Sequence, residues 1–340
     1  MTEQRSNPHD AYFRKVMARH DNAASELRTA LPAAIIHRID FTDLRLQPGS
    51  FVHPDLSNRY SDLLYRTRLD GHPAYIYVLM EHQSSSDRFM AFRMLEYMIA
   101  IWRHHLADNH RDRKLKRPGA TTATTLPAII PLVVHNTAEG RAWSAPTELS
   151  DLLDLDDAAR EALGPYLPRF RFLLDDIAAL DPAALRERDL TPAARVLLVL
   201  QRIAPKNPAL GHDMLDWLDD LRALESGPDP LGDYLTLLNY LMTVSETPEA
   251  DVAAVFERLG PRAKEAIVTT AEIIEARGEA RGEARGEARG RAEALIEQMT
   301  AKFGPLPDAI VHHVHSAELA QVRTWTVRVL TATTLDELFA

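Results

Sequence analysis

The segment 75-YIYVLMEHQSSSDRFMAFRMLEYM-98 decides the fold. It starts as an almost unbroken apolar run, which is typical of a buried strand, and reaches Glu81, His82 and Gln83 before a helix-like pattern begins. A charge at the end of a buried strand is costly unless it is paired or binds a cation. The segment therefore raises the question of what Glu81 binds.

A second strand candidate precedes this one. It covers Arg59–Leu69, and the sequence DGHP separates it from the strand Ala74–Gln83. Asp-Gly between two apolar, alternating segments predicts a β-hairpin. The two strands should therefore lie side by side and antiparallel.

The hairpin brings two carboxylates together. If the loop is only DG, Asp62 lies opposite Leu79 and diagonal to Glu81. If the loop is DGHP, Asp62 lies directly opposite Glu81. Both registers place Asp62, Glu81 and Gln83 on one face of the sheet, and such cross-strand neighbours are about 4.5–8 Å apart at Cβ.

Two carboxylates this close raise a pKa unless a cation lies between them. Mg²⁺ is the expected ion, with Mn²⁺ or Ca²⁺ as alternatives, because it prefers oxygen ligands and takes one or two carboxylates together with water and substrate phosphate. The carbonyl of His82 can add a ligand beside Asp62 and Glu81. The alternative is that both acids are surface residues, paired with Arg59, Arg66 or Arg93.

The other elements of the first part of the chain indicate an α/β fold. Helices are predicted over residues 7–17, 23–36 with an interruption near Pro32, and from a cap at Ser86 or Asp87 to about Leu106. A further buried strand is predicted over Ile129–His135. We expect a mixed sheet flanked by helices.

The third of these helices carries an apolar stripe that we expect to be mostly buried. Its residues are Phe89, Phe92, Leu95, Ile99, Trp102 and Leu106, widened by Met90, Met94 and Ile101. A basic segment follows, with Arg111, Arg113, Lys114, Lys116 and Arg117. This segment is either a solvent-exposed charged loop or a contact to a nucleic-acid backbone.

The second half of the chain is predicted to be helical throughout, because apolar residues recur there every three or four positions. From Glu275 the four-residue unit EARG repeats, so that like charges meet at i,i+4 and each glycine weakens the helix. A helix stabilised by self-association, an incompletely folded linker and a tolerated replication slippage are the three interpretations. We expect domains at residues 1–145, 146–270 and 271–340.

Composition limits the function further. The net charge is −10, so bulk electrostatics should not hold nucleic acid, and a DNA contact would have to be local or bridged by metal. The chain has no cysteine, no secretory signal pattern and no apolar segment long enough to span a membrane. A cytoplasmic protein is the expectation.

The chain resembles the PD-(D/E)XK nuclease superfamily, and within it the recombination-promoting nuclease (Rpn) or putative transposase family. The resemblance covers about residues 7–150, on the segments NPHDAYFRKVM, YSDLLYRTRL, EHQSS…D…M.FR.L.YM and IIPLVVHN…W…P. It implies that Asp62 and Glu81 hold the metal. Gln83 would stand where most of the superfamily has lysine and would orient the attacking water through hydrogen bonds.

The same resemblance implies that residues after the E-x-Q motif line the cleft. Arg93 and Tyr97 share one helix face, so Arg93 could contact phosphate, although a surface ion pair and a core-edge tyrosine are equally compatible. Glu26 is a weaker candidate for a further acid. The expected function is a Mg²⁺-dependent endonuclease that acts on double-stranded DNA, with promotion of recombination as its expected role.

The alternative is a degenerate nuclease scaffold that acts as an interaction module through its helical half. In either case, the C-terminal helices are candidates for forming a homo-oligomer. The charge stripes of the repeat, with Arg277 and Glu279 on nearly opposite sides, would complement each other only between helices.

Overall fold

The computed structural model describes residues 7–48, 61–81, 86–117 and 122–339, without the side chains of residues 61, 62, 80, 81, 182, 274, 276–282 and 284. The chain divides into two compact units, residues 1–267 and 268–340. None of the described helices is both long and apolar enough to cross a membrane.

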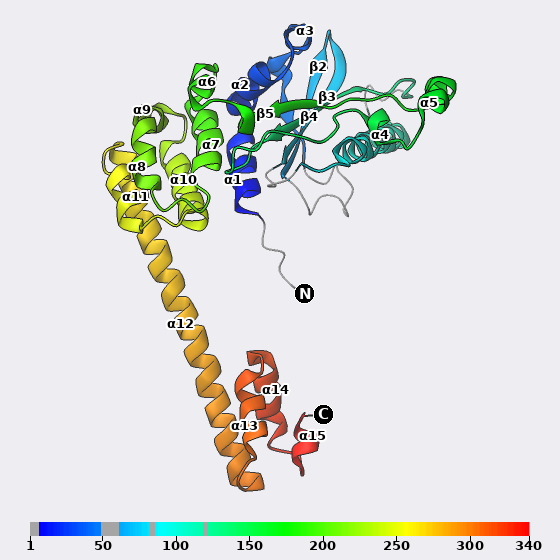
Figure 1. The fold of residues 1–340 in the computed structure, drawn as a ribbon. Helices are drawn as coiled ribbons and strands as arrows, with labels where there is room; N and C mark the ends of the chain where they lie inside the picture. The colour runs from blue at the N-terminus through cyan, green and yellow to red at the C-terminus, as the bar shows by residue number, and fades with distance from the viewer. Residues whose placement is uncertain (1–6, 49–60, 82–85, 118–121, 340) are drawn as a thin grey trace. The chain divides into compact units, whose positions relative to one another are not determined.

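Within the described residues, a mixed sheet of five strands in the order β1-β2-β3-β4-β5 organises the first unit (Figure 1). Strands β1, β2 and β3 are antiparallel, whereas β3, β4 and β5 run parallel. The strands are β1 Arg45–Leu46, β2 Ser61–Leu69, β3 His72–Glu81, β4 Ala128–His135 and β5 Leu173–Asp176. The predicted α/β fold with a mixed sheet is confirmed, but β5 was not predicted.

The hairpin between β2 and β3 has the shorter of the two predicted loops. Asp70 and Gly71 form the turn with φ angles of 50° and 82°, and both values belong to the type I′ turns that suit a two-residue hairpin. Leu69 then pairs with His72, and Asp62 with Leu79. The predicted hairpin is therefore confirmed, in the register that makes Asp62 diagonal to Glu81.

The helices surround this sheet and continue beyond it. Those of the first part are α1 Pro8–Met17, α2 His20–Ala30, α3 Ala33–Ile36 and α4 Met90–Lys114. Those that follow β4 are α5 Asp157–Leu163, α6 Pro182–Glu187, α7 Pro192–Ile203, α8 Leu210–Asp213, α9 Leu218–Ala223, α10 Pro230–Val244, α11 Glu249–Phe256 and α12 Pro261–Phe303. The predicted helical character of the second half is thus confirmed apart from β5.

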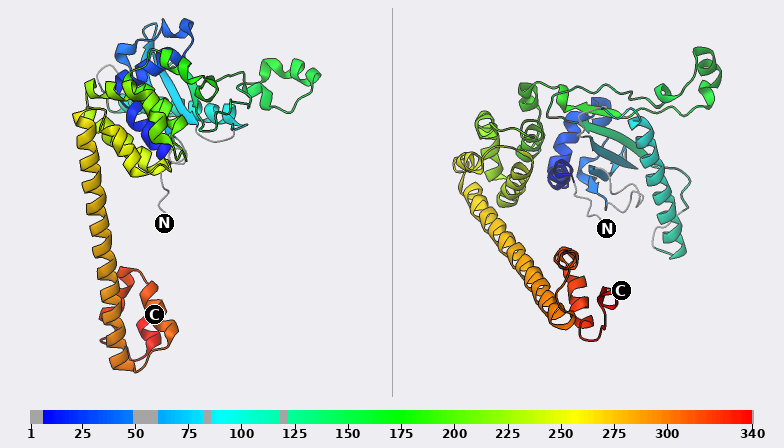
Figure 2. Two further views of the ribbon diagram at one scale, coloured as in Figure 1. Left: turned by 60° about the vertical axis from the view of Figure 1, so that its left-hand side comes forward. Right: turned by 60° about the horizontal axis from the view of Figure 1, so that its bottom comes forward.

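Alternation along the strands sends side chains to two different cores. Leu63, Ile76 and Val134 face α1, α2 and α7, while Leu64 and Leu79 face α4. In Figure 1 and in the right-hand view of Figure 2, α4 lies on one side of the sheet and α1 on the other. The sheet is therefore the middle layer between two helical layers.

The core on the α1 side continues into the helices that follow the sheet. Tyr12 of α1 stacks on Tyr240 of α10 with ring centroids 4.5 Å apart, and buried residues of this core extend to Ala266. The predicted domain boundary between residues 145 and 146 falls inside this unit.

Helix α4 differs from its prediction in extent and in orientation. It begins after Asp87, whose Oδ1 accepts a hydrogen bond of 2.8 Å from the Phe89 amide, and it ends at Lys114 rather than near Leu106. Three of the basic residues predicted to lie in a loop, Arg111, Arg113 and Lys114, therefore belong to its last turn.

The buried face of α4 was predicted only in part. Met90, Met94 and Ile101, the residues expected to widen the stripe, are buried against the sheet together with Ala91 and Tyr97. Of the predicted stripe, Phe89, Phe92, Ile99 and Leu106 are exposed. The helix has two apolar stripes, and periodicity alone does not decide which of them meets the sheet.

The second unit has a small core of its own. Helices α13 Asp308–Ser316, α14 Leu319–Arg328 and α15 Leu335–Phe339 pack with the end of α12 around Leu295, Met299 and Trp325.

The EARG repeat lies within the continuous helix α12. Near the end of the repeat, Arg289 pairs with Glu293 and Arg291 with Glu287, both at i,i+4. These pairs lie within one helix, and self-association of α12 stays a prediction.

Candidate functional site

Acidic residues and a histidine are the last residues of neighbouring strands, so they lie at the same end of the sheet. Because β3, β4 and β5 are parallel, their last residues are register partners: Glu81 pairs with His135, and His135 pairs with Asp176. Asp62, near the start of the antiparallel β2, pairs with Leu79, two residues before Glu81. These four positions therefore occupy the face of the sheet that α4 covers.

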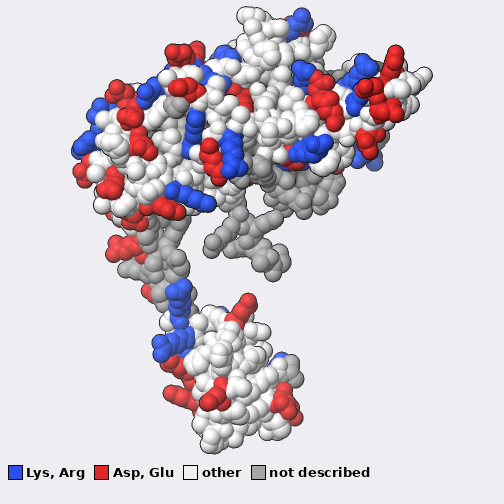
Figure 3. Space-filling view, viewed as in Figure 1, with Lys and Arg blue, Asp and Glu red and all other residues white. Residues whose placement is uncertain are grey.

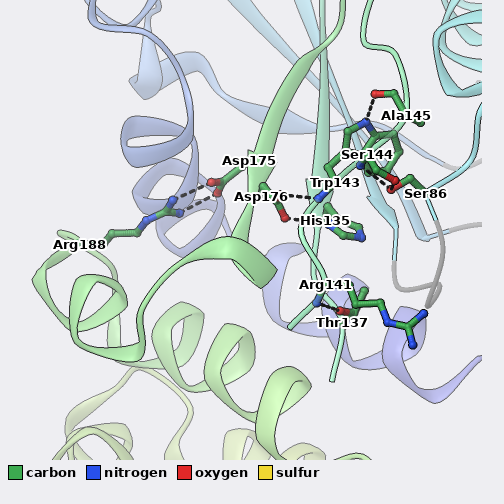
Figure 4. Close-up of polar contacts among 10 residues, drawn as sticks. All are labelled: Ser86, His135, Thr137, Arg141, Trp143, Ser144, Ala145, Asp175, Asp176 and Arg188. Atoms are coloured by element: carbon green, nitrogen blue, oxygen red, sulfur yellow. Dashed lines mark hydrogen bonds and ion pairs between the residues drawn. The ribbon is translucent and has the colours of Figure 1, made fainter. Parts of the chain in front are cut away.

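His135 and Asp176 form a direct polar contact at this end of the sheet (Figure 4). The Nδ1 atom of His135 lies 2.8 Å from Oδ1 of Asp176, and the imidazole side chain is only 2% exposed. An ionised carboxylate can only accept a hydrogen bond, so Nδ1 carries the proton and donates the hydrogen bond to Oδ1 of Asp176. That bond fixes the orientation of the ring and directs Nε2 away from Asp176.

Trp143 completes the support of this pair. Its backbone N–H donates to Oδ2 of Asp176 at 2.7 Å, and its ring meets the ring of His135 edge-on at 5.2 Å. Next to it, the Ser144 amide donates to Oγ of Ser86 at 3.0 Å, so that the chain after β4 is tied to the residues that precede α4. Figure 4 shows these residues together at the strand ends.

The N-terminal turns of α4 lie at the same end of the sheet. Tyr97 contacts Tyr77 with ring centroids 4.8 Å apart, and His105 contacts Tyr75 at 6.5 Å, so α4 runs antiparallel to β3. Arg93 precedes Tyr97 by one helical turn and therefore lies level with the last residues of β3.

The two α4 residues predicted to line the cleft have different surroundings. Arg93 forms an ion pair with Asp87 at 2.5 Å, and its side chain is 15% exposed. Tyr97 is buried, and its ring packs on Tyr77. The burial of Tyr97 favours the structural alternative, in which it supports the sheet rather than contacting a substrate.

Several predicted site residues lie outside the described part of the chain. His82 and Gln83 belong to residues 82–85, and of Asp62 and Glu81 the backbone alone is described. Among the side chains that are described, no group of three or more His, Cys, Asp and Glu residues could hold a metal ion. The metal site predicted at Asp62, Glu81 and His82 therefore stays a prediction.

The chemistry of the available groups does fit a divalent cation. Asp62 and Glu81 occupy one face of the sheet, diagonal across the β2–β3 pair. They would supply carboxylate oxygens and residue 82 a carbonyl oxygen, which are the ligands that Mg²⁺ prefers. The imidazole of His135, one strand further on, belongs to the same row of groups.

The opposite face of the sheet carries a second cluster of charged residues, which interact with one another. Asp175 accepts two hydrogen bonds from Arg188, at 2.6 and 2.7 Å. Burial, reinforced by the negative charge of Asp175, raises the pKa of Glu26 well above its usual range. Glu26 thus lies on the far side of the sheet from Asp62 and Glu81, which excludes it as a further acid of that site.

The basic residues predicted to contact DNA lie at the other end of α4. Arg111 pairs with Asp108 at 2.7 Å and Arg117 with Asp112 at 2.9 Å. With 1.5 Å of rise per residue, Arg111 is about 27 Å along the helix from Arg93. Figure 3 shows Lys and Arg interspersed with Asp and Glu on the visible face of the first unit. The DNA contact by residues 111–117 stays a prediction.

A cavity of about 340 Å³, lined mostly by charged and polar residues, lies near these basic residues, between β2 and the second half of α4. Its walls include Arg66, Arg68, Tyr75, His105 and Asp108. Since Arg66 and Tyr75 are near the turn of the hairpin, this cavity is at the opposite end of the strands from Glu81.

Sequence reasoning missed His135 and Asp176 as members of the site. His135 ends a strand that was predicted correctly, and a histidine in that place was the available signal. Asp176 gave none, because it lies 41 residues later in a strand that was not predicted.

Comparisons with known proteins identify a family. Residues 7–228 match the family described as "Putative transposase, YhgA-like". The chain is 30% identical over 281 residues to recombination-promoting nuclease RpnA of Escherichia coli strain K12, and the match covers 82% of this chain and 86% of that protein.

Two further relatives come from the same strain. Recombination-promoting nuclease RpnC is 26% identical over 80% of this chain and 82% of its own length. The inactive recombination-promoting nuclease-like protein RpnE is 30% identical over 82% of this chain and 85% of its own length. No solved structure matches the chain.

Proposed function

Because the chain belongs to the YhgA-like transposase family, among whose members are proteins named recombination-promoting nucleases, we propose that it is a divalent-metal-dependent DNA endonuclease. The proposal includes a PD-(D/E)XK-type site, double-stranded DNA as substrate and a role in promoting recombination. A cytoplasmic location is part of the same proposal. The family itself was predicted correctly.

One observation supports this proposal above the others. The two-residue hairpin turn sets a register in which Asp62 and Glu81 share a face of the sheet, with His135 as the register partner of Glu81. A register shifted by one residue would have sent Asp62 to the opposite core.

In this proposal the residues at the strand ends have different roles in catalysis. Asp62, Glu81 and the carbonyl of His82 would hold Mg²⁺, or Mn²⁺ or Ca²⁺ in its place. When bound, such an ion polarises the scissile phosphate and lowers the pKa of a water molecule. Gln83 orients the attacking water, because its amide can donate and accept hydrogen bonds but cannot take a proton at neutral pH.

His135 is a positioning residue in this proposal. Asp176 holds its ring through Nδ1, which leaves Nε2 for a contact with the groups at the end of β3. Supporting contacts of this type typically change metal affinity or activity by about 10- to 100-fold. Arg93 lies level with the same strand end. In this proposal its guanidinium leaves its ion pair with Asp87 and contacts a phosphate of the DNA backbone.

A second candidate function is a catalytically inactive scaffold. It is favoured by the relative RpnE, which is named inactive and is as similar in sequence to this chain as RpnA. The presence of Gln83 in place of lysine leaves the site without a basic side chain at that position.

A plasmid cleavage assay with Mg²⁺, Mn²⁺ or Ca²⁺ separates the two candidates. We expect wild type to nick or linearise supercoiled plasmid, Asp62→Asn to lose at least about 100-fold in rate, and His135→Gln to lose about 10- to 100-fold. Glu161→Gln, which changes an exposed carboxylate on α5, is the matched control and should cut at the wild-type rate. Circular dichroism checks that each variant is folded.

The endonuclease proposal fails if wild type leaves the plasmid intact with every cation, or if Asp62→Asn cuts as fast as wild type. The first result would favour the inactive scaffold. The second would point to a contaminating nuclease or to a different site.

A further inference from the structure

The outer face of α4 is an apolar surface that the described part of the first unit leaves exposed. Phe92, Ile99 and Leu106 are 49%, 40% and 45% exposed, whereas Met94 and Ile101 on the inner face are buried. Exposed apolar residues are normal when scattered, but a contiguous row of large ones marks an interaction surface.

These three residues follow a seven-residue spacing. At about 100° per residue they fall within about 40° of arc on the helix, so they form a straight ridge. A seven-residue apolar repeat is the pattern with which one helix packs against another. Glu96 and Arg103, both exposed, lie together along one flank of the ridge.

We propose that this ridge binds the same ridge of a second copy of the chain, in antiparallel orientation. A two-fold axis that passes close to Ile99 places Ile99 against its own counterpart and Phe92 against Leu106 of the second copy. Because a two-fold interface presents the same patch twice, each contact is repeated on the other side of the axis.

Charge complementarity selects this partner and this orientation. In an antiparallel pair, the two-fold axis keeps the charged flanks of both copies on the same side of the ridge. Glu96 then lies opposite Arg103 of the second copy, and two symmetric ion pairs form. A parallel pairing would place the two charged flanks on opposite sides of the ridge, and these ion pairs would be lost.

The neighbouring charges of the helix are already engaged. Arg93 pairs with Asp87, and Arg111 pairs with Asp108. Within the described part of the chain, no ion pair engages Glu96 or Arg103. The two charges that the antiparallel pairing requires are thus available for it.

The strength of the association follows from its size. A single helix pair buries less than the roughly 1,200 Å² that stable interfaces need, so we expect a weak dimer with a Kd in the micromolar range. Such a dimer forms at high local concentration, as when two copies occupy one DNA molecule. The inference does not depend on the nuclease proposal, because it concerns the free protein.

The first test exchanges the two charges in the full-length chain. Sedimentation velocity over a concentration series should show a monomer–dimer equilibrium for wild type. Glu96→Arg or Arg103→Glu alone should weaken it about 10-fold, because each variant places like charges opposite each other at two symmetric positions. The double variant E96R/R103E should restore the wild-type Kd.

The second test uses the absence of cysteine from the sequence. Ile99→Cys places one thiol per chain beside the axis, so mild oxidation should yield a covalent dimer. Tyr166→Cys, at a site that is 84% exposed, is the matched control and should remain mostly monomeric.

Four results would overturn the proposal. The first is a wild type that is monomeric at all concentrations. The second is a wild type that dimerises no better than either single charge variant, which would assign the association to another surface such as α12. The third is that the two cysteine variants cross-link at equal rates. A monomer whose cysteine at position 99 resists a thiol reagent would show that another part of the chain covers the ridge, and this also contradicts the proposal.

Discussion

Glu26 shows how burial, reinforced by a neighbouring carboxylate, can make stability depend on pH through a single residue. Its side chain is buried between α2 and the sheet, near the Asp175–Arg188 pair, and its pKa is raised well above the usual range. At pH values between the unfolded pKa and this raised pKa, the folded protein therefore retains a proton that the unfolded chain releases.

The sign of the resulting pH dependence can be worked out. The carboxyl group of Glu26 ionises at about pH 4.3 in the unfolded chain, while its raised pKa keeps it protonated to higher pH in the folded protein. The contribution of Glu26 to stability is therefore fully present below about pH 4.3 and is lost as the pH rises through the folded pKa.

We predict that Glu26→Gln becomes more stable relative to wild type as the pH rises from about 5 to 8. The neutral amide resembles the protonated acid and has no proton to lose, so the difference should be on the order of 1 kcal/mol or more. Urea unfolding at several pH values measures it. The exposed Glu161→Gln is the control, and parallel stability profiles for wild type and Glu26→Gln would contradict the prediction.

At the scale of single elements, local sequence patterns predicted what depends on neighbours along the chain. Asn7 caps α1 through a 3.1 Å hydrogen bond from the His9 amide, and Asp70-Gly71 forms the expected turn. Both structures arise from side chains and dihedral angles within a few residues.

Features that depend on distant residues could not be predicted in this way. Strand β5 has four residues and ends in two acids, and it forms because β4 offers its free edge. The same holds for α4, where the choice of Tyr97 over Ile99 as the inner residue depends on Tyr77 in the sheet. The candidate site shows the same difference. Its hairpin depends on neighbouring residues and was predicted, whereas the His135–Asp176 pair joins distant residues and was not predicted.

The repeat within α12 supplies an element-scale prediction. Among the described residues, a Cβ atom added at Gly286 or Gly290 would meet nothing within 4 Å. Replacing both glycines by alanine should stabilise the helix by about 1 kcal/mol for each, because glycine loses more backbone freedom on helix formation. Slower amide hydrogen exchange across residues 283–293 is the expected readout.

Gly304 is the contrasting control in the same segment. Its φ of 83° follows the end of α12, so Gly304→Ala should destabilise the chain by forcing a left-handed conformation on a side chain. Unchanged exchange in the variant carrying Gly286→Ala and Gly290→Ala would mean that this segment does not gain from helix propensity.

At the scale of the whole molecule, the two units have separate cores. Leu197 belongs to the core of residues 1–267. Trp325 belongs to the core of residues 268–340, where its ring packs edge-on against the ring of Phe339 with centroids 4.8 Å apart. Separate cores should unfold as separate cooperative units, so a single free energy of unfolding does not describe the chain.

We predict two transitions in scanning calorimetry of the full-length chain. Trp325→Ala should lower the midpoint of one of them by several degrees, since removing a buried aromatic side chain costs about 3–5 kcal/mol. Leu197→Ala should lower only the other. A single transition that both variants shift together would show that the two units unfold as one.

In the part of the chain that the structure describes, the outermost strands of the sheet are also its shortest. At one edge β1 has two residues, and at the other β5 has four, while the strands between them have eight to ten. A short outer strand offers few unpaired backbone groups to another chain, which limits growth of the sheet from molecule to molecule. Crowded copies of this protein should consequently resist cross-β fibre formation, even though the middle strands are rich in the β-branched and aromatic residues that such fibres favour.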